Sequence, residues 1–321
     1  MINPVVSVVM ITYGHESYIK EAVNSVLMQE CDFQFELIIA NDKSPDGTDA
    51  IIRDILNDHP RSHCIRYFHH NKNMGLVSNF NFALKKATGK YIALCEGDDY
   101  WIDSLKLKKQ VDFLEANSKL GMAHSAYFLR NDNEKTFRLM RSSFNHQDRN
   151  LPWGIIGQEL IICTSSVLFR TDLHRRFTNQ YQKDFSLVPI ADTQTWFHFA
   201  RLSGIGYINQ PLSVYRKSAS GVTGSVNTKA RIRFLENALK LDLYLADTYN
   251  APEIWREKIK YKFSRSILIE ALLDGDSYRI KKYGTEIFQK KHLLLGLLQQ
   301  LILLPFAKRQ LINRFLVIFK K

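Results

Sequence analysis

The densest group of acidic residues in the chain is Glu96-Gly97-Asp98-Asp99. Carboxylates this close repel one another, which is costly at the mouth of a sheet unless a cation gathers them. Mg²⁺ and Mn²⁺ favour oxygen ligands and bridge carboxylates to substrate phosphates, where they offset the charge of a departing diphosphate. The motif therefore predicts a site for Mn²⁺ or Mg²⁺ that serves phosphate chemistry. A solvated acidic turn that caps the next helix is the alternative.

A second acidic position, Asp42, follows the apolar run LIIAN. The next residues, Pro45-Asp46-Gly47, are typical of a tight turn, and Thr48 is a suitable N-cap for a following helix. That turn leaves Asp42 itself unexplained. At the end of a strand, Asp42 could accept a hydrogen bond from the N–H of a nucleotide base, and a structural role is the alternative.

The segment from Val5 to about Tyr91 must position both acidic sites, and it alternates apolar, β-rich runs with helical periodicity. This rhythm predicts parallel strands joined by right-handed crossovers. The strands are nearly continuous in Val, Ile and Leu, as expected when helices cover both faces of a sheet. We therefore predict an α/β fold with a doubly wound sheet. Ligands bind beyond the carboxyl ends of such strands, where residues 12–14, 41–46 and 96–99 lie.

The pattern changes after Trp101. A helix is predicted over about residues 103–117, followed by a β-hairpin over 122–142 whose turn is Asn131-Asp132-Asn133. Another helix follows Asp192.

The last part of the chain is predicted to be mainly helical. Residues 205–216 are typical of short strands, residues 218–227 have the composition of a loop, and the pattern is helical from Thr228 to the end. We therefore expect a boundary near residue 226, between a domain over 1–225 and a helical region over 226–321.

Several other classes of site are excluded. Neither G-x-G-x-x-G nor G-x-x-x-x-G-K-[ST] occurs, so a nucleotide must be held by side chains and metal, and a nucleotidyltransferase is disfavoured. The cysteines stand alone and are predicted to be reduced and buried: Cys31, Cys64, Cys95 and Cys163. His15, His69 and His70 lack metal-ligand spacing relative to the acidic motif, and we predict structural roles for them.

The charge of the chain indicates an anionic partner. The 44 Lys and Arg exceed the 32 Asp and Glu, giving a formal charge of +12. Residues 281–321 carry nine Lys or Arg and one Glu around the uncharged run Leu293–Ala307. This pattern predicts a helix that lies on an anionic membrane surface at the inner leaflet. A helical pair packed on the catalytic domain or in a homodimer is the alternative, and nucleic acid is disfavoured. The N-terminus lacks the pattern of a secretory signal, so we expect a cytoplasmic protein, peripheral on the cytoplasmic face of the membrane.

The chain resembles family 2 glycosyltransferases with the GT-A fold. The resemblance is carried by VSVVMITYGHESYIKEAVNSVLMQ, ELIIANDKSPDGT, NKNMGLVSNFNFALKKATGKYIAL, CEGDDYW and ADTQTWFHFARLSGIGYINQPLSVYR, in that order over about residues 5–225. It implies a GT-A type Rossmann-like mixed sheet with a C-terminal helical extension. The donor half would be about 1–101 and the acceptor half about 102–225.

The resemblance also implies roles for particular residues. Asp98, or its neighbour Asp99, would hold the metal in a D-x-D motif. Asp192 would be the catalytic base, although a helix N-cap is its structural alternative. The nucleotide-sugar would be bound by Thr12, Tyr13, Glu16, Asp42, Ser44, Asn73, Gly75, Asn79, Glu96, Gly97, Asp99, Trp101 and Arg216. Of these, Asp42 would read the base and Glu96 would lie toward the ribose.

The chain departs from the family pattern at two places. Many members carry a His two residues after the pair that corresponds to Tyr215-Arg216, and this chain has Ser218 there. Metal ligation must then depend on the acidic motif and water, while Arg216, Lys217 or the hydroxyls of Ser218 and Ser220 could contact the diphosphate. Ala191 stands where an acidic residue is usual, which removes one acceptor contact.

The expected function is that of a metal-dependent inverting glycosyltransferase of hexosyl or N-acetylhexosaminyl type. We expect a UDP-sugar as donor and a hydroxyl of a glycan or lipid-linked acceptor, in the synthesis of a cell-surface polysaccharide. In an inverting transfer one carboxylate removes the proton of the acceptor hydroxyl, so a protein nucleophile is unnecessary. The alternative is a non-catalytic nucleotide-sugar or carbohydrate-binding protein of the same fold.

Overall fold

The computed structural model describes residues 4–132, 135–142, 151–157, 161–181, 191–217 and 227–288. The chain divides into two compact units. The first comprises Met1–Ile155 and Glu159–Lys217, and the second comprises Ile156–Gln158 and Ser218–Lys321.

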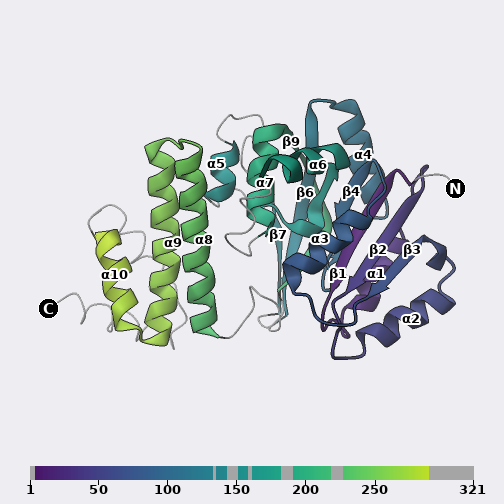
Figure 1. Cartoon of the computed structure of the whole chain (residues 1–321), viewed down its shortest axis with the longest axis horizontal. Coiled ribbons are helices and arrows are strands. Elements are labelled where there is room, and N and C mark those ends of the chain that lie inside the picture. Colours follow the sequence, from purple (N-terminus) through teal and green to yellow (C-terminus); the bar gives the residue numbers. More distant parts are fainter. Residues whose placement is uncertain are drawn as a thin grey trace. The chain divides into compact units, whose positions relative to one another are not determined.

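The first unit is built on one mixed sheet. Its strands are β1 (Val6–Thr12), β2 (Phe35–Asn41), β3 (Ile65–His69), β4 (Tyr91–Leu94), β5 (Tyr100–Trp101), β6 (Leu120–Asn131), β7 (Thr136–Met140), β8 (Val167–Arg170) and β9 (Gly204–Lys217). Within the described residues they lie in the order β3-β2-β1-β4-β8-β6-β9-β5, with β7 beside β6 (Figure 1). The predicted mixed α/β sheet is therefore confirmed.

The parallel half of the sheet brings strand ends together. Strands β1, β2, β3 and β4 run parallel, and the register pairs Val6 with Phe35 and Thr12 with Asn41. Every residue of β1 and β2 is buried, as expected for strands that helices cover on both faces. The crossovers contain α1 (Ile19–Leu27), α2 (Thr48–Asp58) and α3 (Leu76–Lys86). The carboxyl ends of β1 and β2 therefore lie side by side.

The second half of the sheet is mainly antiparallel. The predicted hairpin is confirmed by β6 and β7, which pair from Tyr127↔Met140 to Asn131↔Thr136. Residues 205–216 were expected to form short strands, but they lie within one long strand, β9. Its ladder with β6 shifts register where Ala126 pairs with Pro211, because proline has no N–H to donate. The interruption therefore bends the pairing without ending the strand.

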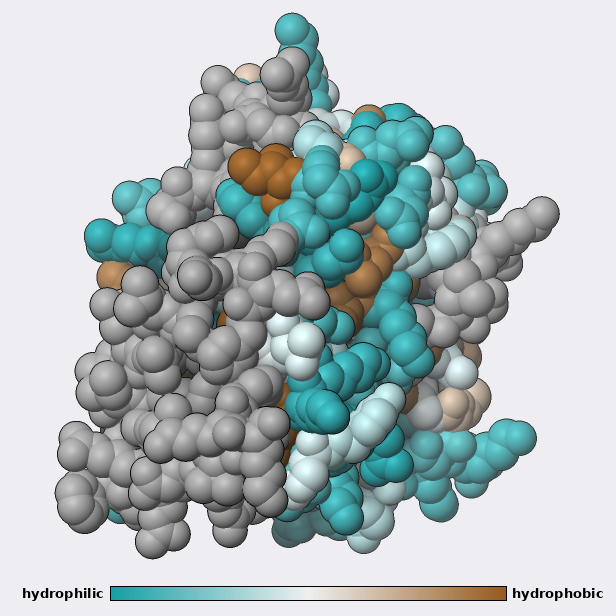
Figure 2. All heavy atoms as spheres, turned by 90° about the vertical axis from the view of Figure 1, so that its left-hand side faces the viewer, coloured by the Kyte–Doolittle hydropathy of each residue, from teal (hydrophilic) through white to brown (hydrophobic). Residues whose placement is uncertain are grey.

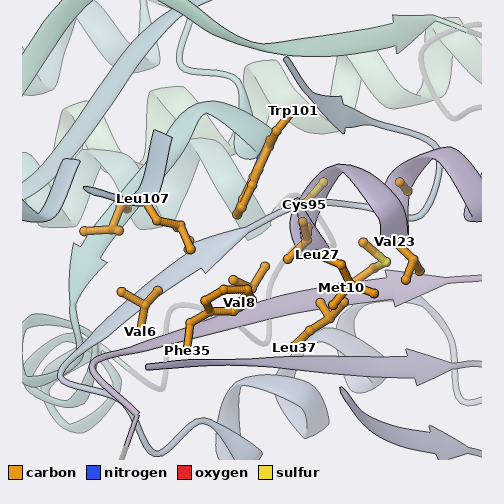
Figure 3. Close-up of a cluster of buried hydrophobic side chains, with 14 of the residues drawn as sticks. Val6, Val8, Met10, Val23, Leu27, Phe35, Leu37, Cys95, Trp101 and Leu107 are labelled. Carbon is orange, nitrogen blue, oxygen red and sulfur yellow. The ribbon is translucent and has the colours of Figure 1, made fainter. Parts of the chain in front are cut away.

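The remaining helices before residue 217 are α4 (Lys106–Ala116), α5 (Leu151–Ile156), α6 (Thr171–Tyr181) and α7 (Ala191–Leu202), with short 3-10 turns η1 (Ser62–Cys64) and η2 (Thr164–Ser166). Helices α4, α6 and α7 pack on the strands of this half, while η1 lies against α2 and β2. The predicted helix over 103–117 is confirmed as α4. The core between sheet and helices includes Val8, Met10, Leu27, Leu37 and Trp101 (Figure 3).

The second unit contains three described helices: α8 (Thr228–Thr248), α9 (Glu253–Asp274) and α10 (Ser277–Phe288). Asn227 caps α8 by accepting a hydrogen bond from the N–H of Ala230 at 3.1 Å. Gly275, with a φ of +78°, ends α9 in the left-handed conformation. Helices α8 and α9 pack together and α10 packs on α9 (Figure 1). The predicted helical extension is thus confirmed for 228–288, while residues 289–321, with the predicted membrane helix, lie outside the described residues.

No helix in the described part of the chain is long and apolar enough to span a membrane.

Candidate functional site

The acidic turn Glu96–Asp99 extends β4 alongside the end of β1. The N–H of Cys95 donates to the carbonyl of Val9 at 3.1 Å, and the N–H of Gly97 donates to the carbonyl of Ile11 at 3.0 Å. These bonds continue the parallel ladder past the end of the strand. The acidic turn is therefore fixed beside Thr12, the last residue of β1.

The three carboxylates of this turn lie in different environments. Asp99 is 2% exposed, and its Oδ1 accepts a hydrogen bond from the backbone N–H of Arg216 at 2.8 Å. The Oε2 atom of Glu96 is buried and has no hydrogen-bond partner among the described residues. The side chain of Asp98 is 20% exposed. Asp98 is therefore the carboxylate that is open to a ligand, whereas Asp99 is hydrogen-bonded to β9.

Burial and neighbouring charge raise the pKa values of Glu96 and Asp99. Burial, reinforced by the charge of Asp98, raises the pKa of Glu96 to about 8. Burial and the charges of Asp98 and Glu96 raise the pKa of Asp99 well above its ordinary range. The guanidinium of Arg216 donates to the backbone carbonyl of Asp98. Glu96 and Asp99 therefore favour their protonated forms near neutral pH, and a bound cation would favour their ionised forms instead.

The loop after β1 is tied to the turn after β2. The N–H of Gly14 donates to Oγ of Ser44 at 3.1 Å, and the N–H of His15 donates to Oγ1 of Thr48 at 3.0 Å. The carboxylate of Glu16 accepts a hydrogen bond from the N–H of Gly47 at 3.0 Å. Tyr13 is 49% exposed. Ser44 and Glu16 therefore shape this loop, while Tyr13 is open to a ligand.

Asp42 lies at the carboxyl end of β2 and is 3% exposed. Its Oδ1 accepts from the N–H of Met74 at 2.7 Å, and its Oδ2 accepts from the N–H of Gly75 at 2.9 Å. Asn73 also accepts from the N–H of Gly75, at 2.9 Å, and Gly75 has a φ of +82° that favours glycine. Asp42 therefore holds the loop that leads into α3.

Asn79 lies within α3 and is enclosed by protein. It is 2% exposed, and its Nδ2 donates to the carbonyl of Ala40 at 3.0 Å while its Oδ1 lies 2.9 Å from Nε2 of His70. Asn79 thus joins α3 to β2 and β3, and the predicted structural role of His70 fits this contact.

Trp101 and Arg216, both predicted to contact the donor, are also enclosed. Trp101 is 1% exposed, donates through Nε1 to the carbonyl of Ser165 at 3.0 Å, and lies among the core side chains of Figure 3. The Arg216 side chain is 4% exposed, and its guanidinium carbon lies 4.6 Å and 5.1 Å from the ring centroids of Tyr18 and Tyr100. The structure therefore does not place either side chain at an open surface.

Arg216 instead supports the acidic turn. Its Nε donates to the carbonyl of Asp98 at 2.8 Å, and its Nη2 pairs with Oε2 of Glu21 at 2.5 Å. Together with the bond from its backbone N–H to Asp99, these contacts fasten the acidic turn to β9 and α1.

Asp192 lies in the first turn of α7 and is exposed. Its Oδ1 accepts a hydrogen bond from the N–H of Thr193 at 2.7 Å. Protein around the carboxyl group raises its pKa, and the charge of Asp192 contributes to the raised pKa of Glu96. Asp192 and Glu96 therefore lie within electrostatic reach of each other. Ser218 and Ser220 lie outside the described residues.

His15 was predicted to be structural, yet its ring lies at the acidic turn. The Nε2 of His15 is 3.9 Å from Oδ2 of Asp98, and its Nδ1 is 3.2 Å from Oγ1 of Thr12. Gly97 permits this approach, because a Cβ at that position would lie 2.7 Å from Oγ1 of Thr12 and 2.8 Å from Nδ1 of His15. Spacing along the sequence could not predict this contact, because it depends on the absence of a Cβ at Gly97.

A preformed cluster of three or more His, Cys, Asp or Glu suited to a metal is not found in the part of the chain that is described. The carboxylate of Asp98 can still serve an ion that takes its other ligands from substrate phosphates and water, which is common for Mg²⁺. The residues present therefore fit a divalent ion that binds together with its substrate.

The family model named Glycosyl transferase family 2 matches residues 7–177, which is more than half of the chain. The chain belongs to glycosyl transferase family 2. This membership confirms the family predicted from the sequence, and it supports a transferase.

Relatives differ in how much of the chain they share. An uncharacterised protein of Mycobacterium tuberculosis is 31% identical over 230 residues, which cover 70% of this chain and 62% of that protein. The match thus spans less than two thirds of that relative's length. An uncharacterised glycosyltransferase of Haemophilus influenzae is 24% identical over 90% of this chain and 94% of its own. A Bacillus subtilis glycosyltransferase, provisionally named for teichuronic acid biosynthesis, is 29% identical over 67% of this chain and 79% of its own.

Solved structures share the fold. The mannosyltransferase PcManGT of Pyrobaculum calidifontis, in complex with GDP-Man and Mn²⁺, has a TM-score of 0.57 at 16% identity, over 99% of this chain and 86% of that chain. TarS 1-349 of S. aureus, in complex with UDP-GlcNAc, has a TM-score of 0.52 at 16% identity, over 88% of each chain. These likenesses confirm the predicted GT-A type of fold.

Proposed function

We propose that this chain is an inverting glycosyltransferase that moves a sugar from a nucleotide diphosphate to a hydroxyl acceptor. The observation that carries the proposal is the acidic turn beside the ends of β1 and β2, with Asp98 open and Asp192 within electrostatic reach. Membership of glycosyl transferase family 2 supports the reaction class.

Asp42 can serve the donor without releasing the loop that it holds. A carboxylate offers about four lone-pair sites, and the N–H groups of Met74 and Gly75 occupy two of them. Because Asp42 is 3% exposed, we propose that a base N–H reaches a remaining site from the edge at which β2 ends. We propose a UDP-sugar as donor, of hexosyl or N-acetylhexosaminyl type, because the TarS 1-349 structure is a complex with UDP-GlcNAc.

Asp192 is the proposed general base. A base works best when its pKa lies near the working pH, and the protein that surrounds the carboxyl group of Asp192 raises its pKa by desolvation. In the proposed reaction Asp192 takes the proton of the acceptor hydroxyl. The oxygen of that hydroxyl bonds to the anomeric carbon at the same time. The bond from that carbon to the diphosphate oxygen breaks, and the nucleotide diphosphate leaves with the electron pair.

A divalent ion, Mn²⁺ or Mg²⁺, is the proposed cofactor. Asp98 would hold it, and when bound it would neutralise charge on the diphosphate. Asp99, the predicted alternative ligand, is 2% exposed and bonded to β9, so we propose that it positions the acidic turn instead. Arg216 and Trp101 are proposed to act in the same indirect way, because their side chains contact protein.

The proposed acceptor is a hydroxyl of a glycan or lipid-linked saccharide in cell-surface polysaccharide synthesis. The name of the Bacillus subtilis relative supports this class. Figure 2, which views the left-hand side of Figure 1, shows mainly hydrophilic side chains among those described. The proposed association with the cytoplasmic face of the membrane rests on the basic and apolar sequence of 281–321.

Donor binding tests the proposal. Calorimetric titration of the full chain with UDP-, GDP- and dTDP-sugars, with Mn²⁺, Mg²⁺ or chelator, is expected to show metal-dependent binding of one donor. Asp98→Ala should abolish the metal dependence, and Asp112→Ala, on the surface of α4, is the matched control. Absence of binding to every donor with every metal would refute the proposal. Binding without any turnover would favour the alternative of a non-catalytic sugar-binding protein.

A further inference from the structure

The ring of His15 and the carboxylate of Asp98 share one opening. Their side chains are 21% and 20% exposed, and Nε2 lies 3.9 Å from Oδ2. This separation is too long for a hydrogen bond. Two donor atoms that bind one ion at about 2.1 Å lie roughly 3 to 4 Å apart, depending on the angle between them. The distance therefore suits an ion between the two groups.

The ring is also oriented for ligation. Its other nitrogen, Nδ1, lies 3.2 Å from the hydroxyl oxygen of Thr12, which is 2% exposed. When Nδ1 donates its proton to this hydroxyl, the lone pair of Nε2 is directed to the side of Asp98. A metal-binding His almost always donates its second N–H to an oxygen acceptor, most often a carboxylate, a backbone carbonyl or water, and the hydroxyl of Thr12 can fix the tautomer and the ring in the same way.

The backbone of His15 is held from two directions. Its N–H donates to Oγ1 of Thr48 at 3.0 Å, and its carbonyl accepts from the N–H groups of Tyr18 and Ile19 at 2.9 Å and 2.8 Å. Gly97 supplies the space in which the ring meets the acidic turn. The position of the imidazole is thus built by four separate segments, as a preorganised ligand requires.

We propose that His15 is the second protein ligand, with Asp98, of the divalent ion at this site. The inference rests on the proposed function, and it adds a consequence for metal choice. Mn²⁺ and Mg²⁺ both take carboxylate and water ligands, but Mn²⁺ is a first-row transition metal and accepts an imidazole nitrogen more readily than Mg²⁺ does. The chain should therefore bind its nucleotide better with Mn²⁺ than with Mg²⁺, and His15 should be the reason.

The experiment measures Mn²⁺ and Mg²⁺ affinity of the full chain in the presence of UDP or GDP, by electron paramagnetic resonance for Mn²⁺ and by calorimetry for both ions. Three variants separate ligation from the hydrogen bond to Thr12. His15→Ala removes both groups, His15→Asn can keep the bond to Thr12 but has no atom at Nε2, and His15→Gln extends an amide to the position of Nε2. The exposed His63, on η1, provides the matched control His63→Ala.

We expect His15→Ala and His15→Asn to weaken Mn²⁺ binding at least about tenfold and Mg²⁺ binding less, so that the preference for Mn²⁺ falls. His15→Gln should recover part of the Mn²⁺ affinity, and His63→Ala should bind both ions as the wild type does. Full Mn²⁺ affinity in His15→Asn would overturn the inference. The hydrogen bond to Thr12, and not ligation of the metal, would then explain the position of the His15 ring. If the wild type binds the nucleotide with metal and all variants match it, only the ligand inference fails. If the wild type binds no nucleotide with any metal, the proposed function fails with it.

Discussion

A buried amine in α4 leads to a quantitative prediction about stability. Lys106 is 0% exposed, its Nζ donates to Oε1 of Gln110 at 2.7 Å, and it lies 4.1 Å from the ring centroid of Trp101. Burial lowers the pKa of this amine from 10.5 to about 7. At about 1.36 kcal/mol for each pKa unit, the charged form costs the fold roughly 5 kcal/mol.

Lys106→Met should remove that cost while retaining a long apolar side chain. The variant leaves Oε1 of Gln110 without its donor, which costs about 1 to 3 kcal/mol, so we expect a net gain of roughly 2 to 4 kcal/mol at pH 6. The unfolded chain binds the proton of Lys106 up to pH 10.5 and the folded chain only to about pH 7. The contribution of Lys106 to wild-type stability therefore rises with pH across that window, and the advantage of the variant should vanish or reverse near pH 10.

Urea unfolding of both proteins between pH 6 and pH 10 measures this difference. Lys108→Met is the control, because Lys108 lies on the same helix but pairs with Asp32 and Asp112 at the surface. Its effect should stay below about 1 kcal/mol. A difference between Lys106→Met and wild type that does not change with pH would refute the reasoning, since the amine would then titrate in contact with water.

Three further predictions concern the acidic turn and acid stability. Gly97→Ala should place a methyl group 2.7 Å from Oγ1 of Thr12 and displace the loop after β1, so calorimetry should show nucleotide affinity with Mn²⁺ reduced at least about tenfold. Arg216→Met should leave Glu21 and the carbonyl of Asp98 without their donor, with a loss of about 2 to 4 kcal/mol in urea unfolding and a fall in donor hydrolysis. Burial lowers the pKa of His174 to about 4, so wild-type stability should fall as the pH drops from 6.5 toward 4, and His174→Phe should remove about 2 to 3 kcal/mol of that loss in melting experiments.

Each of these has an outcome that contradicts it. Unchanged metal-dependent affinity in Gly97→Ala would show that the loop tolerates the methyl group. Normal donor hydrolysis in Arg216→Met would contradict the positioning role of the guanidinium. Arg216→Lys keeps the charge but should recover little of the hydrolysis. A His174→Phe melting curve that follows the wild type down to pH 4.5 would mean that the ring is protonated inside the fold without cost.

Much of the fold follows from local patterns. Strands β1 and β2 are buried throughout, so their continuous apolar runs are sufficient to predict a parallel sheet covered on both faces. The turn at Asn131-Asp132 likewise predicts the hairpin of β6 and β7. The length of strand β9 was harder to predict, because Pro211 is typical of a strand break. In the structure the strand continues through Pro211 with a shift in register.

The site was less accessible to sequence reasoning because side-chain direction depends on tertiary contacts. Trp101 and Arg216 have residue types suited to a donor site, but Trp101 pairs with Ser213 of β9 and donates to Ser165, and Arg216 donates to the carbonyl of Asp98. His15 and Asp98 meet only because Gly97 lacks a side chain, and no spacing along the chain encodes that approach.

The central claim is tested most directly by donor hydrolysis in Asp192→Asn. The full chain, its metal and the donor identified by titration should release free sugar slowly, and the variant should bind the donor normally yet hydrolyse it at least about a hundredfold more slowly. Asp172→Asn, an exposed acidic residue in the first turn of α6, is the control and should behave as the wild type. Hydrolysis at the wild-type rate in Asp192→Asn would contradict the assignment of the base and with it the proposed mechanism.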